Sequence, residues 1–326
     1  TGEISAGAGT GTQGSTFGFG TKENNFLGKN IMFDTNLRVT DETLKGKFSV
    51  INPKWNYTDK LLKTSIESST TDRMTDFGYE TSTTGFILGA GWEQYDDVYF
   101  TPEISSFYEK LDTNQTASTK MKEQEGEYFD INFAYALDLD KRNQRFQTSD
   151  GYRSRFNQRI PLISDDYAFL NSYDYTTYNQ FGNMVTRVAF LARTINSING
   201  EDVRISKRLY IPTKRLRGFE SMRIGPIDSG DYIGGNHTAV FNASTTLPDF
   251  GANLEKVDFQ VFFDAANVWG VDYDSSLDNS TIRSSTGFSV DWYTAVGPLN
   301  FSITQPLSKA SSDKTETFRF NIGTTF

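Results

Sequence analysis

The chain has 326 residues, a formal net charge of -9, no cysteine and one histidine, His237. The lack of cysteine excludes disulfides, thiol chemistry and cysteine-ligated metal sites. The negative charge argues against a nucleic-acid partner, which would need a basic face. Plentiful Phe (27) and Tyr (16) with scarce Pro (8) favour one large all-β domain over residues 1–326.

The longest apolar runs, such as Val261-Phe262-Phe263, are only a few residues long, so no transmembrane helix is expected. A transmembrane β-barrel shows only alternation, in segments of roughly 10 residues, and its polar lumen keeps the average hydropathy low. The mean hydropathy of -0.50 fits such a barrel and also fits a soluble β-protein.

The first stretch, residues 3–20, is rich in glycine and predicts two short strands around Thr12-Gln13. Glycine removes side-chain packing and adds chain entropy, so the strand at 3–9 is expected to be weak. Clean two-residue alternation begins at Asn30. Further strands are predicted at 43–51, 60–71, 77–92, 98–111, 127–139, 151–160, 167–181 and 185–195. The polar segment 112–126 is interpreted as a surface loop.

Five more strands are predicted after a long non-alternating segment, at 238–247, 257–265, 282–292, 300–303 and 318–326. The total of about sixteen is an even number within the range of single-chain bacterial barrels. One face of most strands is apolar and the other carries Arg, Asp or Asn. We therefore predict a transmembrane antiparallel β-barrel with lipid-facing and lumenal faces. A soluble sandwich or propeller with one wet face is the disfavoured alternative.

Conventional catalysis is poorly supported by the residue types present. A single histidine does not readily make a catalytic triad, and Gly11-x-x-Gly14 lacks the Lys of a phosphate-binding loop. The pairs Asp96-Asp97 and Asp165-Asp166 lie in predicted turns and are interpreted as solvated. We expect no enzyme activity, no cofactor and no metal site.

Two sets of residues resemble known outer-membrane proteins. Phe318-x-Phe320-x-Ile322-x-Thr324-x-Phe326 is similar to the C-terminal signal strand of bacterial outer-membrane proteins. Arg217-Gly218-Phe219, Ile224-Gly225-Pro226 and Gly234-Gly235-Asn236 resemble the sixth extracellular loop of the BamA family, the central barrels of the outer-membrane protein assembly machinery. The resemblance is close over residues 216–326 and continues through Phe263–Trp269, Val296–Leu299, Ile303–Leu307 and Phe320–Gly323.

The resemblance implies that the loop, about 197–236, folds back into the lumen and acts as a latch. Arg217 would pair with acidic residues of the wall, Gly218 would permit a turn and Phe219 would anchor it. Asp264 falls on the polar face of its strand, which makes it the expected partner. Family members carry a Glu where this chain has Ser244, so Arg217 relies either on Asp264 alone or on another acid.

The resemblance also implies a lateral seam between the first and last strands, which we assign to Gly7, Gly9, Phe318, Phe320, Ile322 and Phe326. Such a seam would open as a gate and offer its first strand to an incoming protein. The implied function is insertion of β-barrel proteins into the bacterial outer membrane. The implied partners are membrane lipids, nascent barrel proteins, and BAM lipoproteins and periplasmic chaperones, the last two mostly through POTRA domains that this sequence lacks.

Two other functions remain open at this point. One is a protein-translocating barrel of the same superfamily, of the TamA or two-partner secretion type. The other is a diffusion porin. Single-channel conductance separates these alternatives, because a porin is a large steady pore and the assembly family implies a plugged barrel.

Overall fold

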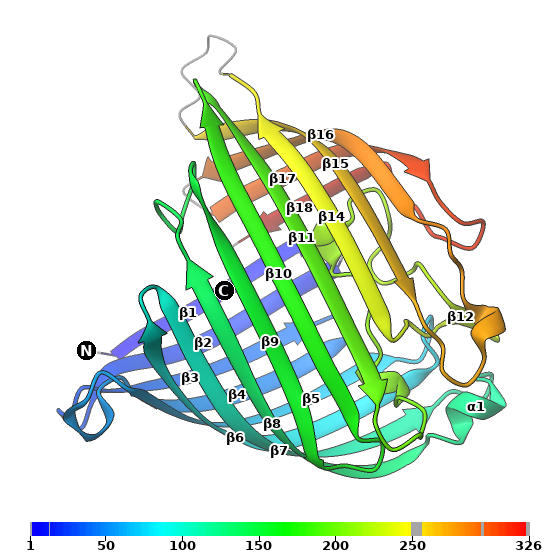
Figure 1. The fold of residues 1–326 in the computed structure, drawn as a ribbon, viewed down its shortest axis with the longest axis horizontal. Helices are drawn as coiled ribbons and strands as arrows, with labels where there is room; N and C mark the ends of the chain where they lie inside the picture. The colour runs from blue at the N-terminus through cyan, green and yellow to red at the C-terminus, as the bar shows by residue number, and fades with distance from the viewer. Residues whose placement is uncertain (1, 13, 249–255, 295–296, 324–326) are drawn as a thin grey trace.

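The computed structural model describes residues 2–12, 14–248, 256–294 and 297–323. Sixteen strands in these ranges close into one antiparallel barrel, in which neighbours in sequence are neighbours in space (Figure 1). The predicted all-β barrel is thereby confirmed. Two further short strands, β12 (Ile227–Asp228) and β13 (Asp231–Tyr232), form a separate hairpin within the long loop. No helix in the described ranges is long and apolar enough to cross a membrane.

The first eight barrel strands are β1 (Gly2–Gly11), β2 (Gly14–Phe26), β3 (Ile31–Thr40), β4 (Thr43–Asn52), β5 (Leu61–Arg73), β6 (Tyr79–Tyr95), β7 (Val98–Thr113) and β8 (Gly126–Asp140). The other eight are β9 (Gly151–Ile163), β10 (Ala168–Phe181), β11 (Met184–Ser197), β14 (His237–Thr246), β15 (Val257–Trp269), β16 (Arg283–Thr294), β17 (Gly297–Ser308) and β18 (Phe318–Gly323). The helical segments are η1 (Trp55–Tyr57), α1 (Thr119–Lys122), η2 (Ile205–Lys207), η3 (Thr213–Arg215) and η4 (Ser275–Leu277).

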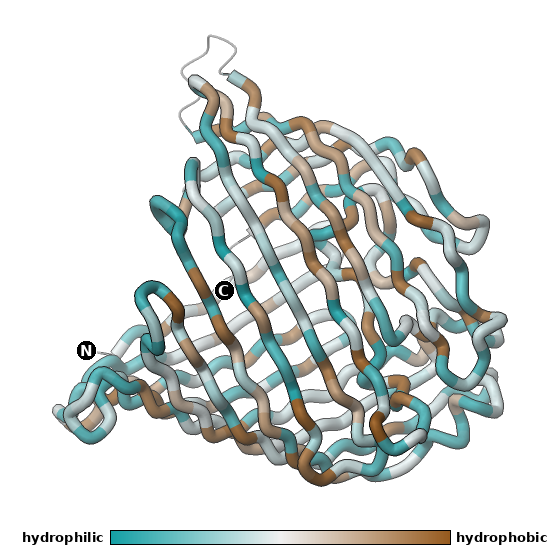
Figure 2. Tube along the Cα trace, viewed as in Figure 1, coloured by the Kyte–Doolittle hydropathy of each residue, from teal (hydrophilic) through white to brown (hydrophobic). Residues whose placement is uncertain are grey.

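Side chains along each strand alternate between two environments. In β5, Ser65 is fully buried whereas its neighbour Ile66 is 53% exposed. Hydrophobic and polar positions alternate in the same way along the other strands (Figure 2). The exposed apolar side chains include Phe86, Ile104, Phe129, Phe190, Phe241 and Ile303. An apolar outer belt around a polar interior is the pattern of a barrel that spans a lipid bilayer.

The two ends of the barrel differ in their connections. The end at which β1 begins, here called the hairpin end, carries short turns such as those between β6 and β7 and between β10 and β11. The opposite end, here called the loop end, carries the long connections 114–125, 198–236, 270–282 and 309–317. Figure 1 places α1 and β12 at this loop end.

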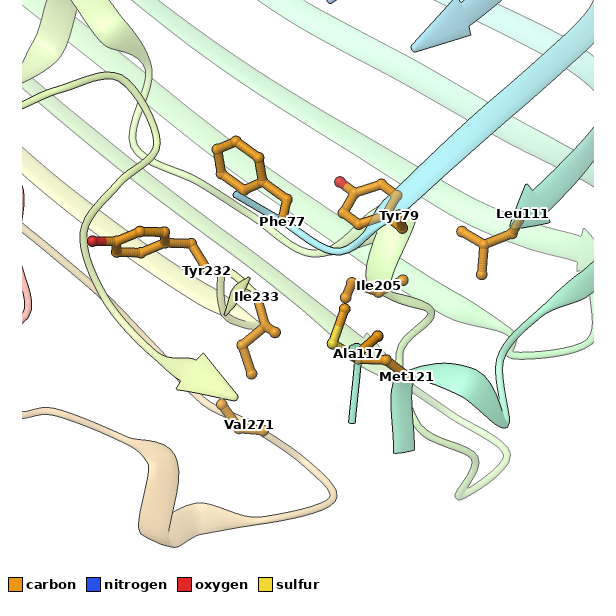
Figure 3. Close-up of a cluster of buried hydrophobic side chains, with 9 residues drawn as sticks. All are labelled: Phe77, Tyr79, Leu111, Ala117, Met121, Ile205, Tyr232, Ile233 and Val271. Atoms are coloured by element: carbon orange, nitrogen blue, oxygen red, sulfur yellow. The ribbon is translucent and has the colours of Figure 1, made fainter. Parts of the chain in front are cut away.

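A hydrophobic cluster joins several connections at the loop end, and we call it the cap cluster (Figure 3). Its buried members are Phe77, Tyr79, Leu111, Ala117, Met121, Ile205, Tyr232, Ile233 and Val271. The segment predicted as a surface loop contributes α1, whose Met121 is only 1% exposed. The charged residues of this segment remain in solvent while two apolar side chains, Ala117 and Met121, pack inward, a distinction that average composition does not reveal.

Strand β17 is longer than predicted. The sequence indicated a short strand at 300–303, but β17 covers Gly297–Ser308 and includes two prolines. Pro306 lies opposite Ser285 at the point where the register between β16 and β17 shifts. At a bulge one residue is left out of the ladder of backbone hydrogen bonds. The missing N–H of proline is therefore tolerated there, and the strand continues.

The outward direction of Ile66 gives a test of the membrane-facing belt. We expect Ile66→Arg to lower the free energy of unfolding in lipid by about 2–4 kcal/mol, because a guanidinium in the hydrocarbon layer loses its water. Gln260 lies on the lumenal face and donates to Asp291, so the Gln260→Arg variant should be tolerated. Denaturant titrations of both variants in lipid vesicles measure the difference, and equal losses would contradict the assigned faces.

Candidate functional site

The junction between β1 and β18, here called the seam, is short. Its described register comprises three pairs, Gly9 with Gly323, Thr10 with Ile322 and Gly11 with Asn321. One more hydrogen bond runs from the amide of Thr12 to the carbonyl of Phe320, at 3.1 Å. By contrast, β1 and β2 are paired over ten positions, from Gly2 to Gly11. Among the described pairings of neighbouring barrel strands, the seam is the shortest.

The structure brings some of the predicted seam residues together and separates others. Gly9, Phe320 and Ile322 take part in the junction. Gly7 lies opposite Gly18 of β2, and Phe318 lies opposite Ile303 of β17. Phe326 lies outside the described residues.

The other residues of the seam register, Thr10, Gly11, Asn321 and Gly323, were not predicted. A Cβ atom on Gly11 would lie 2.3 Å from the carbonyl oxygen of Phe320, so only glycine fits this approach between the strands. The outward positions of β1 beside the seam carry small side chains, Ala6 and Ala8. The β18 side presents Phe318, which is 49% exposed. The two sides of the seam therefore differ strongly in bulk.

The long loop, residues 198–236, lies inside the barrel. Its side chains and backbone contact inward residues of β7, β8, β10, β15, β16 and β18, which lie on different sides of the wall. Figure 1 shows the loop passing through the interior behind β14 and β15. A segment that touches so many walls occupies the lumen.

Arg217 and Asp264 form a two-pronged ion pair at the centre of this loop. Nε and one terminal nitrogen of Arg217 donate to the two carboxylate oxygens at 2.7 and 2.8 Å, and the Arg217 amide donates at 3.1 Å. Asp264 is fully buried, and Asn242 also donates to it at 2.8 Å. The Arg217 guanidinium lies 3.4 Å from the ring centre of Phe262.

These contacts show how Arg217 is bound although Ser244 stands where family members carry a Glu. Among the described residues, Asp264 is the acid that pairs with Arg217. Additional support comes from Asn242, which lies directly opposite Asp264, and from the ring of Phe262, which lies opposite Ser244. A hydrogen-bonded carboxylate and a ring face are both favourable surroundings for a planar guanidinium.

The neighbouring loop residues have equally restricted surroundings. Gly218 has a φ of +87°, and a Cβ atom there would lie 2.5 Å from the Thr304 methyl group. Phe219 is 2% exposed and packs in a cluster with Leu191, Ile211, Leu216, Ile224, Val240, Ala266 and Val268. The four predicted latch residues therefore occupy one place in the lumen. Their role as a latch remains a prediction.

The wall also binds the backbone of this loop. Four wall contacts end on carbonyl oxygens of alternate loop residues, at distances of 2.6 to 2.8 Å. The donors and acceptors are Arg319 to Thr213 and Phe219, Asn242 to Arg215, and Ser285 to Arg217. Three backbone bonds and one isolated bridge, at Phe219 and Thr315, join the loop to the connection before β18. The last strand and its connection are thus fixed to the loop.

A second anchor, the Arg204 cluster, was missed by the sequence reasoning. Arg204 is 2% exposed and donates to Glu109 and Asp130, each at 3.1 Å, and it lies 3.6 Å from Asp166. Lys207 binds Asp130 at 3.0 Å and Asp166 at 2.6 Å. Two cations thus meet three carboxylates. The inward positions of Glu109 and Asp130 and the cationic run in the loop were the available signals.

Asp166 corrects an interpretation made from the sequence. Residues Asp165-Asp166 were read as a solvated turn, but the Asp166 side chain is buried, with the residue 6% exposed, and accepts hydrogen bonds from Ser164, Lys207 and the Arg204 amide. In the folded barrel the long loop covers Asp166, so this part of the turn is not solvated.

Three further loop arginines have acidic partners on separate parts of the barrel. Arg215 pairs with Asp174 of β10, whereas Arg208 and Arg223 pair with Asp272 and Asp76 of the connections 270–282 and 74–78. Burial raises the pKa of Asp76, but its bonds to Arg223 and Lys314 outweigh burial and hold that pKa below its ordinary value. Loop residues have no hydrogen bond or ion pair to β1–β4 within the described ranges. No cluster of three or more potential metal ligands occurs there either.

The Arg217 pair gives a test of loop docking. We expect Arg217→Ala to destabilise docking by roughly 3 kcal/mol, because it leaves the buried Asp264 charge without its cation. Cleavage by proteinase K within residues 218–230 should then increase about a hundredfold. Lys214→Ala is the matched control, since Lys214 is exposed on the same loop. Unchanged protection in the Arg217 variant would rule out the pairing as the anchor.

A model of the Omp85 superfamily domain matches residues 25–326. The outer membrane protein assembly factor BamA of Neorickettsia risticii is 25% identical over 258 residues, which cover 76% of this chain and 34% of that protein. BamA of Neisseria meningitidis is 32% identical over 139 residues, covering 34% of this chain and 17% of that protein. The chain thus spans about a third or less of these curated relatives.

Solved structures give the same result for the fold. BamA from Haemophilus ducreyi lacking POTRA domains 1-3 matches with a TM-score of 0.92 at 22% identity, over 100% of this chain and 70% of that chain. CdiB from Acinetobacter baumannii matches with a TM-score of 0.57 at 13% identity, over 98% of this chain and 59% of that chain. The resemblance to BamA indicated by the loop motif is confirmed, and the chain belongs to the Omp85 superfamily.

Proposed function

We propose that this chain is the membrane barrel of an assembly factor that folds β-barrel proteins and inserts them into the bacterial outer membrane. The short seam is the observation that carries the proposal, since it has three described pairs where β1 and β2 have ten. The loop end, with its long connections, faces the cell exterior, and the hairpin end faces the periplasm. The curated relatives named as assembly factors support the same function.

The energetic basis of this function is the cost of an unpaired strand edge. Unsatisfied backbone groups cost several kcal/mol each in lipid, so a new barrel cannot present open edges to the membrane. Strand β1 can pair with an incoming strand by β-augmentation once its few bonds to β18 are released. Strand β1 then exchanges its partner β18 for the incoming strand, so the incoming edge is not left unpaired in lipid. This exchange lowers the barrier to insertion.

The anchoring of the loop indicates which side of the seam moves. Arg319 of β18 donates to the carbonyls of Thr213 and Phe219, and Asp264 of β15 holds Arg217. Strands β1–β4 have no comparable bond to the loop in the described ranges. We therefore infer that the loop holds the β18 side in place and that β1 and its neighbours swing outward.

Outer-membrane lipids and nascent barrel proteins are the partners that this chain itself would contact. The BAM lipoproteins and the periplasmic chaperones would bind mostly through POTRA domains. The proposed process breaks no covalent bond and requires no cofactor.

A protein-translocating barrel of the same superfamily is the second candidate, because the family model that matches this chain is that of the superfamily as a whole. The third candidate, a diffusion porin, is disfavoured by the ion pairs that fix the loop across the lumen. The seam separates the first two candidates, since insertion requires a lateral opening and export through the lumen does not.

The seam is tested by a disulfide between Thr10→Cys and Ile322→Cys. These positions lie opposite each other, at about the Cα separation that a disulfide spans, and the chain has no other cysteine. We expect oxidation in the full-length protein to abolish insertion of a reporter barrel protein, and reduction to restore it.

The matched control joins Ala8→Cys to Phe17→Cys, an outward pair between β1 and β2. This disulfide leaves the seam free, so insertion should continue. Normal insertion by the oxidised seam variant would refute lateral opening, whereas loss of insertion in both variants would indicate general damage.

Conductance tests whether the loop plugs the lumen. In planar bilayers we expect the unaltered protein to show no large steady conductance, because anchored loop residues cross the lumen. The Arg217→Ala variant should show more frequent large openings. A large steady pore in the unaltered protein would instead favour a porin.

A further inference from the structure

Three arginines line a hollow in the lumen that the loop does not fill. The hollow has a volume of about 310 Å³ and is lined by Arg155 and Arg159 of β9 and Arg193 of β11. Polar groups of Thr101, Asn157 and Ser172 and the carboxylate of Glu103 also line it, together with Tyr135 and Gln158. This hollow lies apart from the Arg217 pair and from the seam.

Strand register explains why these arginines converge. Asn157 lies opposite Ser172, and Ser172 lies opposite Arg193, so these three inward side chains form a row across β9, β10 and β11. Arg159 lies one inward position farther along, opposite Leu170. Two strand spacings, about 10 Å, separate β9 from β11, a gap that two long arginine side chains can span around one small ligand.

Two of these arginines are left without a partner. Arg159 and Arg193 make no hydrogen bond or ion pair with any residue that the structure describes. Arg155 is 3.9 Å from the Asp138 carboxylate and donates to Asn157. Nearer the hairpin end, by contrast, Arg142 forms a bidentate ion pair with Asp140, and Arg153 forms one with Asp138.

The charge in the hollow is unbalanced. Three guanidinium groups face one carboxylate, Glu103, which leaves a net charge of +2 in a chain whose overall charge is -9. Like charges held together in a partly desolvated space repel one another, and a bound anion relieves this repulsion. Guanidinium forks bind phosphate and carboxylate oxygens with two parallel hydrogen bonds.

We propose that this hollow is a binding site for a compact, doubly charged oxyanion of the phosphate class. The net charge of +2 matches a dianion, and the hydroxyls and the amide of the lining supply further donors. The ligand is either free phosphate or the phosphate group of a small phosphomonoester. It enters from the hairpin end, past the paired Arg142 and Arg153. Anion binding here joins β9 to β11 on the wall far from the seam.

Protection from phenylglyoxal, which modifies free arginines, tests the site without altering it. The full-length protein in nanodiscs is treated with and without inorganic phosphate at constant ionic strength, and modified arginines are identified by mass spectrometry. We expect saturable protection of Arg159 and Arg193. Arg38, a lumenal arginine of β3 that also lacks a described partner, should stay reactive. Protection of all three to the same extent, or of none, would overturn the proposal.

Affinity measurements identify the ligand and its contacts. Calorimetric titration compares inorganic phosphate with glycerol 3-phosphate, which separates free phosphate from a phosphomonoester, and with chloride as the monovalent control. We expect Arg159→Gln and Arg193→Gln each to weaken phosphate binding at least tenfold, since each removes a charge-assisted contact. Arg38→Gln is the matched control and should have no effect.

Folding of each variant is checked by heat-dependent gel mobility. If Arg159→Gln does not fold, Arg159→Lys keeps the charge but removes the fork and should weaken binding severalfold. Equal phosphate affinity in the unaltered protein and in the Arg193→Gln variant would refute the site. So would binding of a hexaglutamate peptide in place of phosphate, because that result assigns the hollow to an acidic polypeptide.

Discussion

A carboxylate buried inside the barrel wall is the constraint on which the rest of the lumen depends. Asp264 has no exposed surface, and an ionised carboxylate without a cation is expensive in such a place. The long loop supplies that cation by folding inward and placing Arg217 against β15. Once inside, the loop brings further cations to acidic partners, as in the Arg204 cluster.

These bonds are unevenly distributed around the barrel. The loop holds β18 through Arg319 and the middle strands through Arg204 and Arg215, whereas the first four strands depend on their neighbours alone within the described ranges. Strand β1 also has few pairs with β18 across the seam. The barrel therefore combines a braced body with one weak junction, and the loop determines where the weakness lies. A closed barrel in lipid must otherwise resist opening anywhere, because every exposed edge is costly.

The fold and the centre of the site could be predicted from the sequence, because both depend on short-range patterns. Period-two alternation predicts the barrel, and parity along one strand placed Asp264 in the lumen. The Arg204 cluster could not be predicted, since its acids come from three separate strands and turns. Asp166 was read as solvated because turn composition contains no information about a distant loop. The strand predicted at 300–303 is part of the longer β17, which contains Pro306, and only the pairing with β16 reveals the bulge that accepts this proline.

Between Thr213 and Phe219 the wall binds the main chain of the loop as well as its side chains. Side chains of β14, β16 and β18 donate to the carbonyls of alternate residues from Thr213 to Phe219. Every amino acid offers the same carbonyl, so substitutions at Thr213 or Arg215 leave these bonds available as long as the backbone keeps its path. Natural selection on this part of the loop should then act mainly on shape. The positions with the least freedom to change should be Gly218, whose conformation sets the path, and Arg217 and Phe219, whose side chains are paired or buried.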